Sequence, residues 1–187
     1  MVAIKIDDQI ILRSFKEEDA QALFDAVNNS RSHLHQWLNW VDKTTKPANS
    51  LEFIENSLLE QFNQSGLALG IFLNGIVIGG IGLHNWDQNL KLAHVGYWIG
   101  MDHEGKGIIT KCLLEFIDFL YCKIGLNKIE IRFVPSNKRS AGVAERLGFK
   151  TEGIIRQCVL NNGLINDLVI TGLLKKEWDK KKKDAAV

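Results

Sequence analysis

Residues 97–111 place glycine, lysine and threonine in an order that suits the binding of an anion. This stretch reads Tyr-Trp-Ile-Gly-Met-Asp-His-Glu-Gly-Lys-Gly-Ile-Ile-Thr-Lys, so an apolar run leads into a glycine-containing turn and then into a helical pattern. The first amides of a helix lack partners and lie at the positive end of its dipole, which suits a phosphate. Gly105 and Gly107 would let the backbone approach that anion, and Lys106 adds a positive charge. The competing interpretation is that the two glycines only turn the chain.

A second candidate pair is formed by Asn137 and Ser140. The two residues are three positions apart, so on a helix both side chains can face the same cleft. The alternative is that Ser136 or Asn137 simply caps the helix that begins here.

Other kinds of chemistry are not supported by the residue spacing. The glycine turn matches neither GxxxxGK[ST] nor GxGxxG, which argues against a nucleoside triphosphate or dinucleotide site. The three cysteines form no C-x-x-C pair, and the five histidines show no metal-binding spacing, so we expect no metal site. Cys112 is expected to be a small core residue.

The hydrophobic pattern predicts the strands that must position these residues. Apolar runs over 67–73 and 76–83 flank Asn74-Gly75, a dipeptide typical of a tight type I′ hairpin turn. Two late strands are expected around the turn Asn161-Asn-Gly163. The full set of expected strands is 9–14, 67–73, 76–83, 92–99, 128–134, 149–159 and 164–174.

Helices are expected at the front of the chain and between the later strands. Ser14 and Glu17 have the spacing of a capping box at a helix start, and Ser30 could cap a second short helix. Trp37 and Trp40 follow at helical spacing and are expected to pack in the core, the alternative being a wall of the substrate cleft. Further helices are expected after Pro47, over 108–124 and over 135–147.

Length and composition predict one α+β domain over residues 1–178 with a basic tail at 179–187. The chain has 187 residues, is 45% hydrophobic and has a formal net charge of +1. Nearly balanced charge argues against a protein that coats nucleic acid or a membrane surface. The lysine run at 180–183 is expected to be a frayed, solvated end. The beginning of the chain lacks a signal-peptide pattern and no transmembrane segment is expected, so the predicted location is cytoplasmic.

Several motifs, taken in order, resemble the GCN5-related N-acetyltransferase (GNAT) superfamily. They are Glu104-Gly-Lys-Gly-Ile-Ile109, Ser136-Asn-Lys-Arg-Ser140 and Ala144-Glu-Arg-Leu-Gly-Phe149. The ribosomal-protein (RimJ/RimL) branch is similar at Ser32-His-Leu-His-Gln-Trp-Leu-Asn-Trp40 and at the closing stretch, with Glu152, Asn162-Gly163, Asp167 and Leu173-Leu-Lys-Lys-Glu-Trp178. The resemblance implies a mixed, mostly antiparallel sheet whose central strands splay apart, flanked by helices.

The resemblance also implies transfer of an acetyl group from acetyl-CoA to a primary amine. In the family the backbone amides of the glycine loop hold the CoA pyrophosphate. Where the loop commonly begins with Gln or Arg and ends with Gly or Ala, this chain has Glu104 and Ile109. The loop maps here onto Glu104, Gly105, Lys106, Gly107, Ile108, Ile109 and Thr110.

In the family the pantetheine arm fills the gap between the splayed strands near Tyr97, Trp98 and Ile99, pairing like an added strand. A backbone amide there can stabilise the charge that develops on the thioester oxygen, an effect worth about 3–4 kcal/mol. By the same resemblance Asn137 contacts the pantetheine arm, and Ser140 lies near the sulfur as the general acid. Glu152 and Asp167 are the candidate bases or anchors for the amine, their alternative being surface charge or a structural hydrogen bond. Direct attack needs no cysteine nucleophile.

Three functions stay open for the sequence. The first is acetylation of a protein N-terminal α-amine of the ribosomal-protein type, which the resemblance to that branch implies. Such an amine has a pKa near about 8, against about 10.4 for a lysine, so water or a weak base is enough to deprotonate it. The second is acetylation of a small amine such as a polyamine or aminoglycoside. The third is a non-catalytic acetyl-CoA sensor. A homodimer that shares its late strands is also expected.

Overall fold

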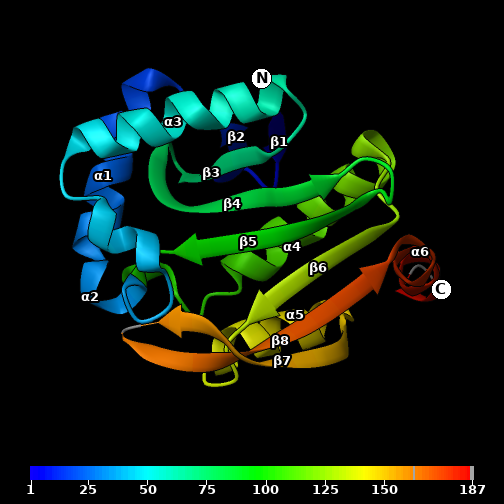
Figure 1. Cartoon of the computed structure of the whole chain (residues 1–187). Coiled ribbons are helices and arrows are strands. Elements are labelled where there is room, and N and C mark those ends of the chain that lie inside the picture. The colour runs from blue at the N-terminus through cyan, green and yellow to red at the C-terminus, as the bar shows by residue number, and fades with distance from the viewer. Residues whose placement is uncertain (162, 186–187) are drawn as a thin grey trace.

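The fold is built on one sheet of eight strands, seen in a computed structural model that describes residues 1–161 and 163–185 (Figure 1). The strand order is β1-β2-β3-β4-β5-β6-β8-β7, and of the paired neighbours only β5 and β6 run parallel. The strands are β1 (Ala3–Lys5), β2 (Ile10–Ser14), β3 (Leu67–Leu73), β4 (Ile76–Asp87), β5 (Leu92–Ile99), β6 (Lys128–Phe133), β7 (Lys150–Asn161) and β8 (Leu164–Leu174). The predicted mixed, mostly antiparallel α+β architecture is therefore confirmed.

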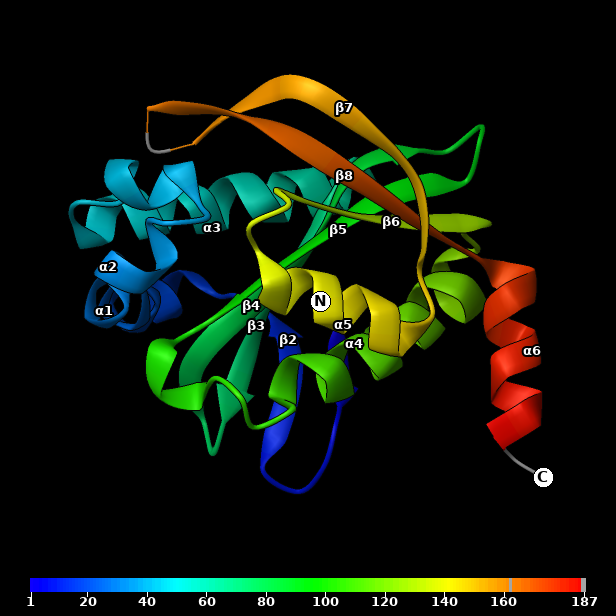
Figure 2. The same ribbon diagram turned by 90° about the horizontal axis from the view of Figure 1, so that it is seen from below.

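Helices cover both faces of this sheet (Figure 2). The helices α1 and α3 pack on one face, where Phe15, Phe72 and Val77 are buried, and α4 lies in the larger core on the other face. Short 3-10 turns precede α1 and α4 and follow α2. The helices are α1 (Ala20–Asn29), α2 (Arg31–Leu34), α3 (Pro47–Phe62), α4 (Ile108–Phe119, continued by a π-helical turn Leu120–Ile124), α5 (Lys138–Leu147) and α6 (Lys175–Ala185).

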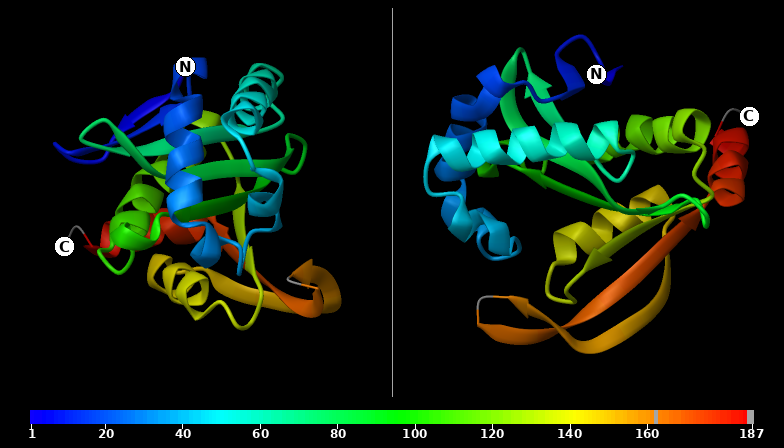
Figure 3. Two further views of the ribbon diagram at one scale, coloured as in Figure 1. Left: turned by 90° about the vertical axis from the view of Figure 1, so that its left-hand side faces the viewer. Right: turned by 45° about the horizontal axis from the view of Figure 1, so that its top comes forward.

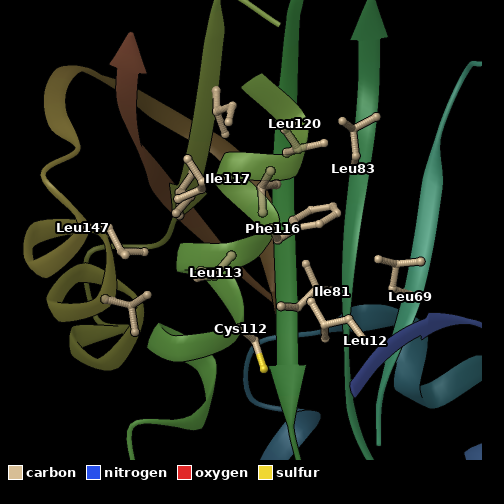
Figure 4. Close-up of a cluster of buried hydrophobic side chains, with 14 of the residues drawn as sticks. Leu12, Leu69, Ile81, Leu83, Cys112, Leu113, Phe116, Ile117, Leu120 and Leu147 are labelled. Carbon is tan, nitrogen blue, oxygen red and sulfur yellow. The ribbon is translucent and has the colours of Figure 1, made fainter. Parts of the chain in front are cut away.

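The helix α4 is held by a stripe of apolar side chains that faces the sheet (Figure 4). Cys112, Leu113, Phe116, Ile117 and Leu120 recur at helical spacing and are all fully buried. Burying one such side chain contributes about 1.5–3 kcal/mol. This packing fixes where the helix begins, and with it the glycine turn that precedes it.

The central strands β5 and β6 separate part-way along their length, as the resemblance implies. They pair only at Leu92↔Lys128, Ala93↔Ile129 and His94↔Glu130. Beyond His94, β5 stays paired with β4, and β6 stays paired with β8 through Phe133, so the two strands diverge without losing their outer neighbours (Figure 1). The separation opens a wedge in the middle of the sheet.

The predicted capping box at Ser14 and Glu17 is wrong. Ser14 is the buried last residue of β2, and its hydroxyl accepts a hydrogen bond from the amide of Val2 (3.0 Å) and donates one to Gln61 Oε1 (3.0 Å). The helical region begins later, where the carboxylate of Asp19 accepts from the Lys16 amide (2.8 Å). Hydrogen bonds to distant residues therefore engage the serine hydroxyl that the local sequence pattern predicted as a helix cap.

The basic run at the end of the chain is helical, contrary to the frayed end predicted. It lies in α6, which packs near the end of α4 (Figure 3). Trp178 is 2% exposed, and its indole Nε1 donates to Asp118 Oδ1 over 2.6 Å. Lys182 pairs with the same aspartate. One buried indole thus anchors a helix that its lysines alone would not hold.

The predicted turns are met in part. Asn74 and Gly75 have φ values of +49° and +84°, so both adopt the left-handed conformation that a type I′ turn requires. The other predicted turn includes Asn162, which lies outside the described residues.

Candidate active site

A cleft of about 700 Å³ opens where β5 and β6 separate. Its walls come from the ends of these two strands, the turn before α4, the start of α5 and the segment around α2. Most of the residues predicted from the sequence to bind cofactor line it. These are Tyr97, Trp98, Ile99, Glu104, Gly105, Gly107, Ile108, Ile109, Thr110, Asn137 and Ser140.

The turn before α4 has the backbone that the glycines were expected to allow. Gly105 and Gly107 have φ values of +70° and +73°, in the left-handed region that side chains disfavour. A Cβ on either glycine would meet no atom within 4 Å, so their role is conformational. Gly107 is the N-cap, and its carbonyl accepts from Lys111. The amides at 108–110 precede the first helical hydrogen bond and lie at the cleft.

Lys106 behaves differently from expectation. Its ammonium donates to the carbonyl of Asp102 over 2.7 Å, so it reaches back along its own loop. It does not line the cleft.

Glu104 does not present a free carboxylate to the cleft. Its Oε1 lies 2.6 Å from His33 Nε2, and Arg139 pairs with its other oxygen. The side chain is 18% exposed. The acidic side chain at the start of the glycine turn is therefore compensated by one group from α2 and one from α5.

Ser140 meets a tyrosine that sequence reasoning did not connect with it. Its Oγ lies 2.9 Å from the hydroxyl of Tyr97 on β5. Burial raises the pKa of Tyr97 to about 12, so this phenol keeps its proton at neutral pH. The amide of Ser140 donates to Asn137 Oδ1 over 3.0 Å, so Asn137 is the cap of α5. The cleft thus holds two coupled hydroxyl groups at the start of α5.

The two predicted bases lie outside the cleft lining. Glu152 accepts a hydrogen bond from Lys128 over 2.5 Å, at the end of β6 far from the wedge. Asp167 accepts from the amide of Gln157 over 2.9 Å, where β7 bulges. Both contacts match the structural alternative considered for these residues, so neither is carried into the mechanism below.

Aromatic side chains form part of the cleft wall, which is the alternative to core packing that the sequence left open. Trp37 lines the cleft. Trp40 is 39% exposed, and its ring centroid lies 6.0 Å from that of Trp98. The helix predicted to hold both tryptophans is shorter than expected, because α2 ends at Leu34, Trp37 lies in a turn and Trp40 lies in a 3-10 turn.

The hairpin of β7 and β8 reaches across to the segment after α2. Asn39 Nδ2 donates to the carbonyl of Leu160 over 2.6 Å, and Asn161 Nδ2 donates to that of Gln36 over 2.6 Å. These two contacts join parts of the chain more than 120 residues apart and close one side of the cleft. No local sequence signal could have indicated them.

The charge of the cleft lining is predominantly positive. Arg132, Lys138, Arg139 and Arg146 line it, while Glu104 is the single carboxylate among the described lining residues. Arg132 pairs with Glu130 and Arg139 with Glu104, so the excess positive charge comes from Lys138 and Arg146. Since Glu104 is already engaged by two cationic or protonatable groups, the described lining offers no free carboxylate to a positively charged ligand.

Two further findings bear on the chemistry. Within residues 1–161 and 163–185, no group of three or more His, Cys, Asp or Glu side chains could hold a metal ion, and no helix is long and apolar enough to cross a membrane. Cys112 is buried, as predicted, and burial raises the pKa of its thiol to about 12, so it is no nucleophile at neutral pH.

Comparison with known proteins connects this geometry with one family. A family model described as an acetyltransferase (GNAT) domain matches residues 9–150. The chain is 33% identical over 183 residues to YdaF of Bacillus subtilis (strain 168), to which a ribosomal N-acetyltransferase activity is provisionally assigned; the match covers 97% of this chain and 100% of YdaF. It is 27% identical over 168 residues to the ribosomal-protein-serine acetyltransferase of Escherichia coli (strain K12), covering 88% and 92%.

A solved structure shows the same fold with a ligand. The microcin C7 self-immunity acetyltransferase MccE, in complex with acetyl-CoA and AMP, superimposes with a TM-score of 0.87 at 28% sequence identity. The superposition covers 91% of this chain and 95% of that one.

Proposed function

Since the chain belongs to the GNAT family and is an acetyl-CoA-dependent N-acetyltransferase, we propose that its acceptor is the α-amine at a protein N-terminus, of the kind that ribosomal proteins carry in the cytoplasm. The observation that carries this proposal is the charge of the cleft: several cations line it, and its one described carboxylate is already paired. A polyamine or aminoglycoside would bring several positive charges into this lining. A peptide N-terminus brings one, and it loses its proton more readily than a lysine does.

The proposed cofactor site follows the wedge from the glycine turn inward. The amides of Ile108, Ile109 and Thr110 lie at the positive end of α4 and are suited to the CoA pyrophosphate. The open space beside Gly105 and Gly107 supports this assignment, because no side chain obstructs the approach of an anion. Within the described residues, the backbone of β5 beyond His94 has no strand partner on its β6 side, which suits pairing with the pantetheine arm.

The proposed chemistry is direct attack of the amine on the thioester carbon. The N–C bond forms, the C–S bond breaks, and the departing sulfur takes a proton from Ser140. Tyr97 positions that hydroxyl through its 2.9 Å hydrogen bond and keeps its own proton available. A backbone amide of β5 would stabilise the charge on the thioester oxygen, an effect worth about 3–4 kcal/mol.

The direct test compares acceptors of different charge with acetyl-CoA as donor. Peptides that begin with Ser or Ala, the same peptides with a blocked N-terminus and an internal lysine, spermidine and kanamycin are each incubated with the enzyme. Release of the CoA thiol gives the rate, and mass spectrometry locates the acetyl group. We expect acetylation of the free N-terminal amine with the highest kcat/KM. A higher kcat/KM for spermidine or kanamycin would refute the proposal.

A second candidate acceptor is a small amine linked to a nucleotide. The MccE structure contains AMP together with acetyl-CoA. In this chain Trp37 lines the cleft, and Trp40 and Trp98 form an aromatic pair beside it, which could stack on a nucleobase. An aminoacyl sulfamoyl adenosine added to the acceptor panel separates this candidate from the first.

The homodimer expected from the sequence stays a prediction. The β7–β8 hairpin carries exposed apolar side chains that a second copy could cover, namely Ile154, Ile155, Leu160, Leu164 and Ile165.

A further inference from the structure

Transfer to an amine requires a group that removes the amine proton, and we propose that His33 is this general base, with Glu104 as its positioning residue. Attack needs a neutral nitrogen, and the tetrahedral nitrogen must then lose a proton. The inference rests on the acetyl-transfer chemistry of the family and holds for any primary amine acceptor.

The other titratable groups that line the cleft are poorly suited to this role. Lysine and arginine side chains carry no lone pair that can accept a hydrogen bond. Tyr97 has a pKa of about 12 and keeps its proton. Glu104 is engaged by two partners. That leaves the imidazoles of His33 and His103, and of these two only His33 is paired with a carboxylate in the described part of the chain.

The contact between His33 and Glu104 sets the state of the imidazole. His33 Nε2 lies 2.6 Å from Glu104 Oε1, which assigns the proton of the neutral ring to Nε2. The lone pair is then on Nδ1, for which the described residues provide no hydrogen-bond partner. Because the side chain is 14% exposed and lines the cleft, this free nitrogen belongs to a group held beside the reaction space.

Contacts made by two residues shortly before His33 hold this part of the chain in place. The hydroxyl of Ser30, one turn earlier, accepts a hydrogen bond from the amide of Met101 over 3.0 Å, which ties the start of α2 to the loop after β5. Arg31 donates to the carbonyls of Val41 and Thr44, over 2.6 Å and 2.5 Å. A catalytic imidazole needs such a fixed frame, since a displacement of about 1 Å can cost about 100-fold in rate.

The proton balance of the proposed step is complete. The amine proton passes to His33 Nδ1 as the N–C bond forms, and the thiolate released by the C–S bond takes its proton from Ser140. Glu104 stabilises the resulting imidazolium, and Arg139 holds the far oxygen of Glu104 in place. The imidazolium then returns its proton to water, and the Ser140 alkoxide takes a proton back from water, which restores both groups. The charged or titratable groups that face His33 from neighbouring elements are Glu104 and, behind it, Arg139.

The test uses His33→Ala and His33→Gln, the second of which keeps a donor for Glu104 but cannot titrate. Each is expected to lower kcat by about 100-fold or more, the usual range for a general base. Calorimetry should show nearly unchanged acetyl-CoA affinity. Added imidazole should restore part of the activity of His33→Ala, and the acid limb of the pH profile should disappear in both variants.

His35→Ala is the matched control, because His35 lies on the same segment, pairs with Asp42 and does not line the cleft. It should retain wild-type kcat. Glu104→Gln should lower kcat and leave the acetyl-CoA affinity nearly unchanged, since the imidazole loses the carboxylate that orients it. Equal rate losses for His33→Ala and His35→Ala, or an unchanged acid limb in either His33 variant, would overturn the proposal. If the acceptor panel described above refutes the N-terminal acceptor, the His33 variants can still be tested with any amine that the enzyme acetylates.

Discussion

The hydrogen bond between Ser140 and Tyr97 shows how one contact can set the chemistry of two residues. The phenol, with its pKa raised to about 12 by burial, remains a donor throughout the neutral range. If it donates to Ser140 Oγ, the proton of the serine hydroxyl is free to point at another acceptor in the cleft. Ser140 can therefore give up its proton while Tyr97 stabilises the oxygen left behind.

This coupling predicts non-additive rate losses. Ser140→Ala should lower kcat by about 100-fold or more, as expected for loss of a general acid. Tyr97→Phe should lower it by up to about tenfold, the worth of one hydrogen bond. Steady-state kinetics of the two variants and of the double variant measure the coupling, while calorimetry checks that acetyl-CoA still binds.

The double variant is the decisive measurement, since Tyr97 should add nothing once the serine hydroxyl is gone. Tyr121→Phe serves as the control, because its hydroxyl donates to the carbonyl of Leu173 inside the core. That variant should lose stability but keep its kcat. Losses that simply multiply in the double variant would show that Tyr97 does not act through Ser140.

At the scale of an element, the turn and first residues of α4 act as one unit. The left-handed glycines bend the chain, and the buried apolar stripe fixes the axis of α4. The free amides at 108–110 are therefore held in a fixed orientation. Gly125 ends the same helical segment and is also left-handed, at φ +83° with no atom near its missing Cβ. It lies outside the cleft lining.

These two glycines allow conformational strain to be separated from ligand binding. Gly107→Ala and Gly125→Ala should each destabilise the fold by about 1–2 kcal/mol, the cost of the left-handed conformation for a residue with a Cβ. Gly107→Asp should in addition abolish detectable acetyl-CoA binding by calorimetry, because it places an anion beside the proposed pyrophosphate site. Gly125→Asp should bind acetyl-CoA as the wild type does. Similar affinity for both aspartate variants would remove the turn from the cofactor site.

Elements whose signals are local were predicted well from the sequence. The turn at Asn74-Gly75 and the strand at Leu92–Ile99 depend on residues next to one another, and both are confirmed. The capping box at Ser14 failed because Gln61, 47 residues away, takes the serine hydroxyl. The lysine run was expected to fray because its stabilising contact, Trp178 on Asp118, joins residues 60 positions apart.

At the scale of the whole molecule, the candidate site also combines features that have a local sequence signal with features that depend on distant contacts. The glycine turn was found because its spacing is itself the signal. The partners that complete the cleft come from distant parts of the chain: Tyr97 and Ser140 are 43 residues apart, and His33 and Glu104 are 71 apart. The sequence therefore did not indicate His33 as the base. It indicated two carboxylates on the late strands instead, Glu152 and Asp167.

Hydrogen bonds and ion pairs to a buried carboxylate also determine how the stability of the whole molecule depends on pH. Arg13 on β2 donates two hydrogen bonds to Asp19, over 2.7 and 2.8 Å, and the Lys16 amide donates a third. Burial alone would raise the pKa of Asp19, but these hydrogen bonds and the charge of Arg13 outweigh it and hold the pKa below its usual value. The carboxylate is thus favoured in the folded state, and the stability it contributes is present above the unfolded pKa and lost as the pH falls through the folded one.

Replacing Asp19 by Asn should therefore destabilise the protein at neutral pH and not in acid. At pH 7 the free energy of unfolding should fall by about 1.5–3 kcal/mol, the worth of hydrogen bonds to a charged group. The difference from wild type should shrink from about pH 4 downwards, because the wild-type carboxylate is then protonated as well. Urea unfolding from pH 7 to pH 2.5 measures it, with Asp8→Asn as control, since Asp8 is 95% exposed and pairs only with Lys5 at the surface. A gap that stays constant across this range would mean that Asp19 acts by packing and not by its charge.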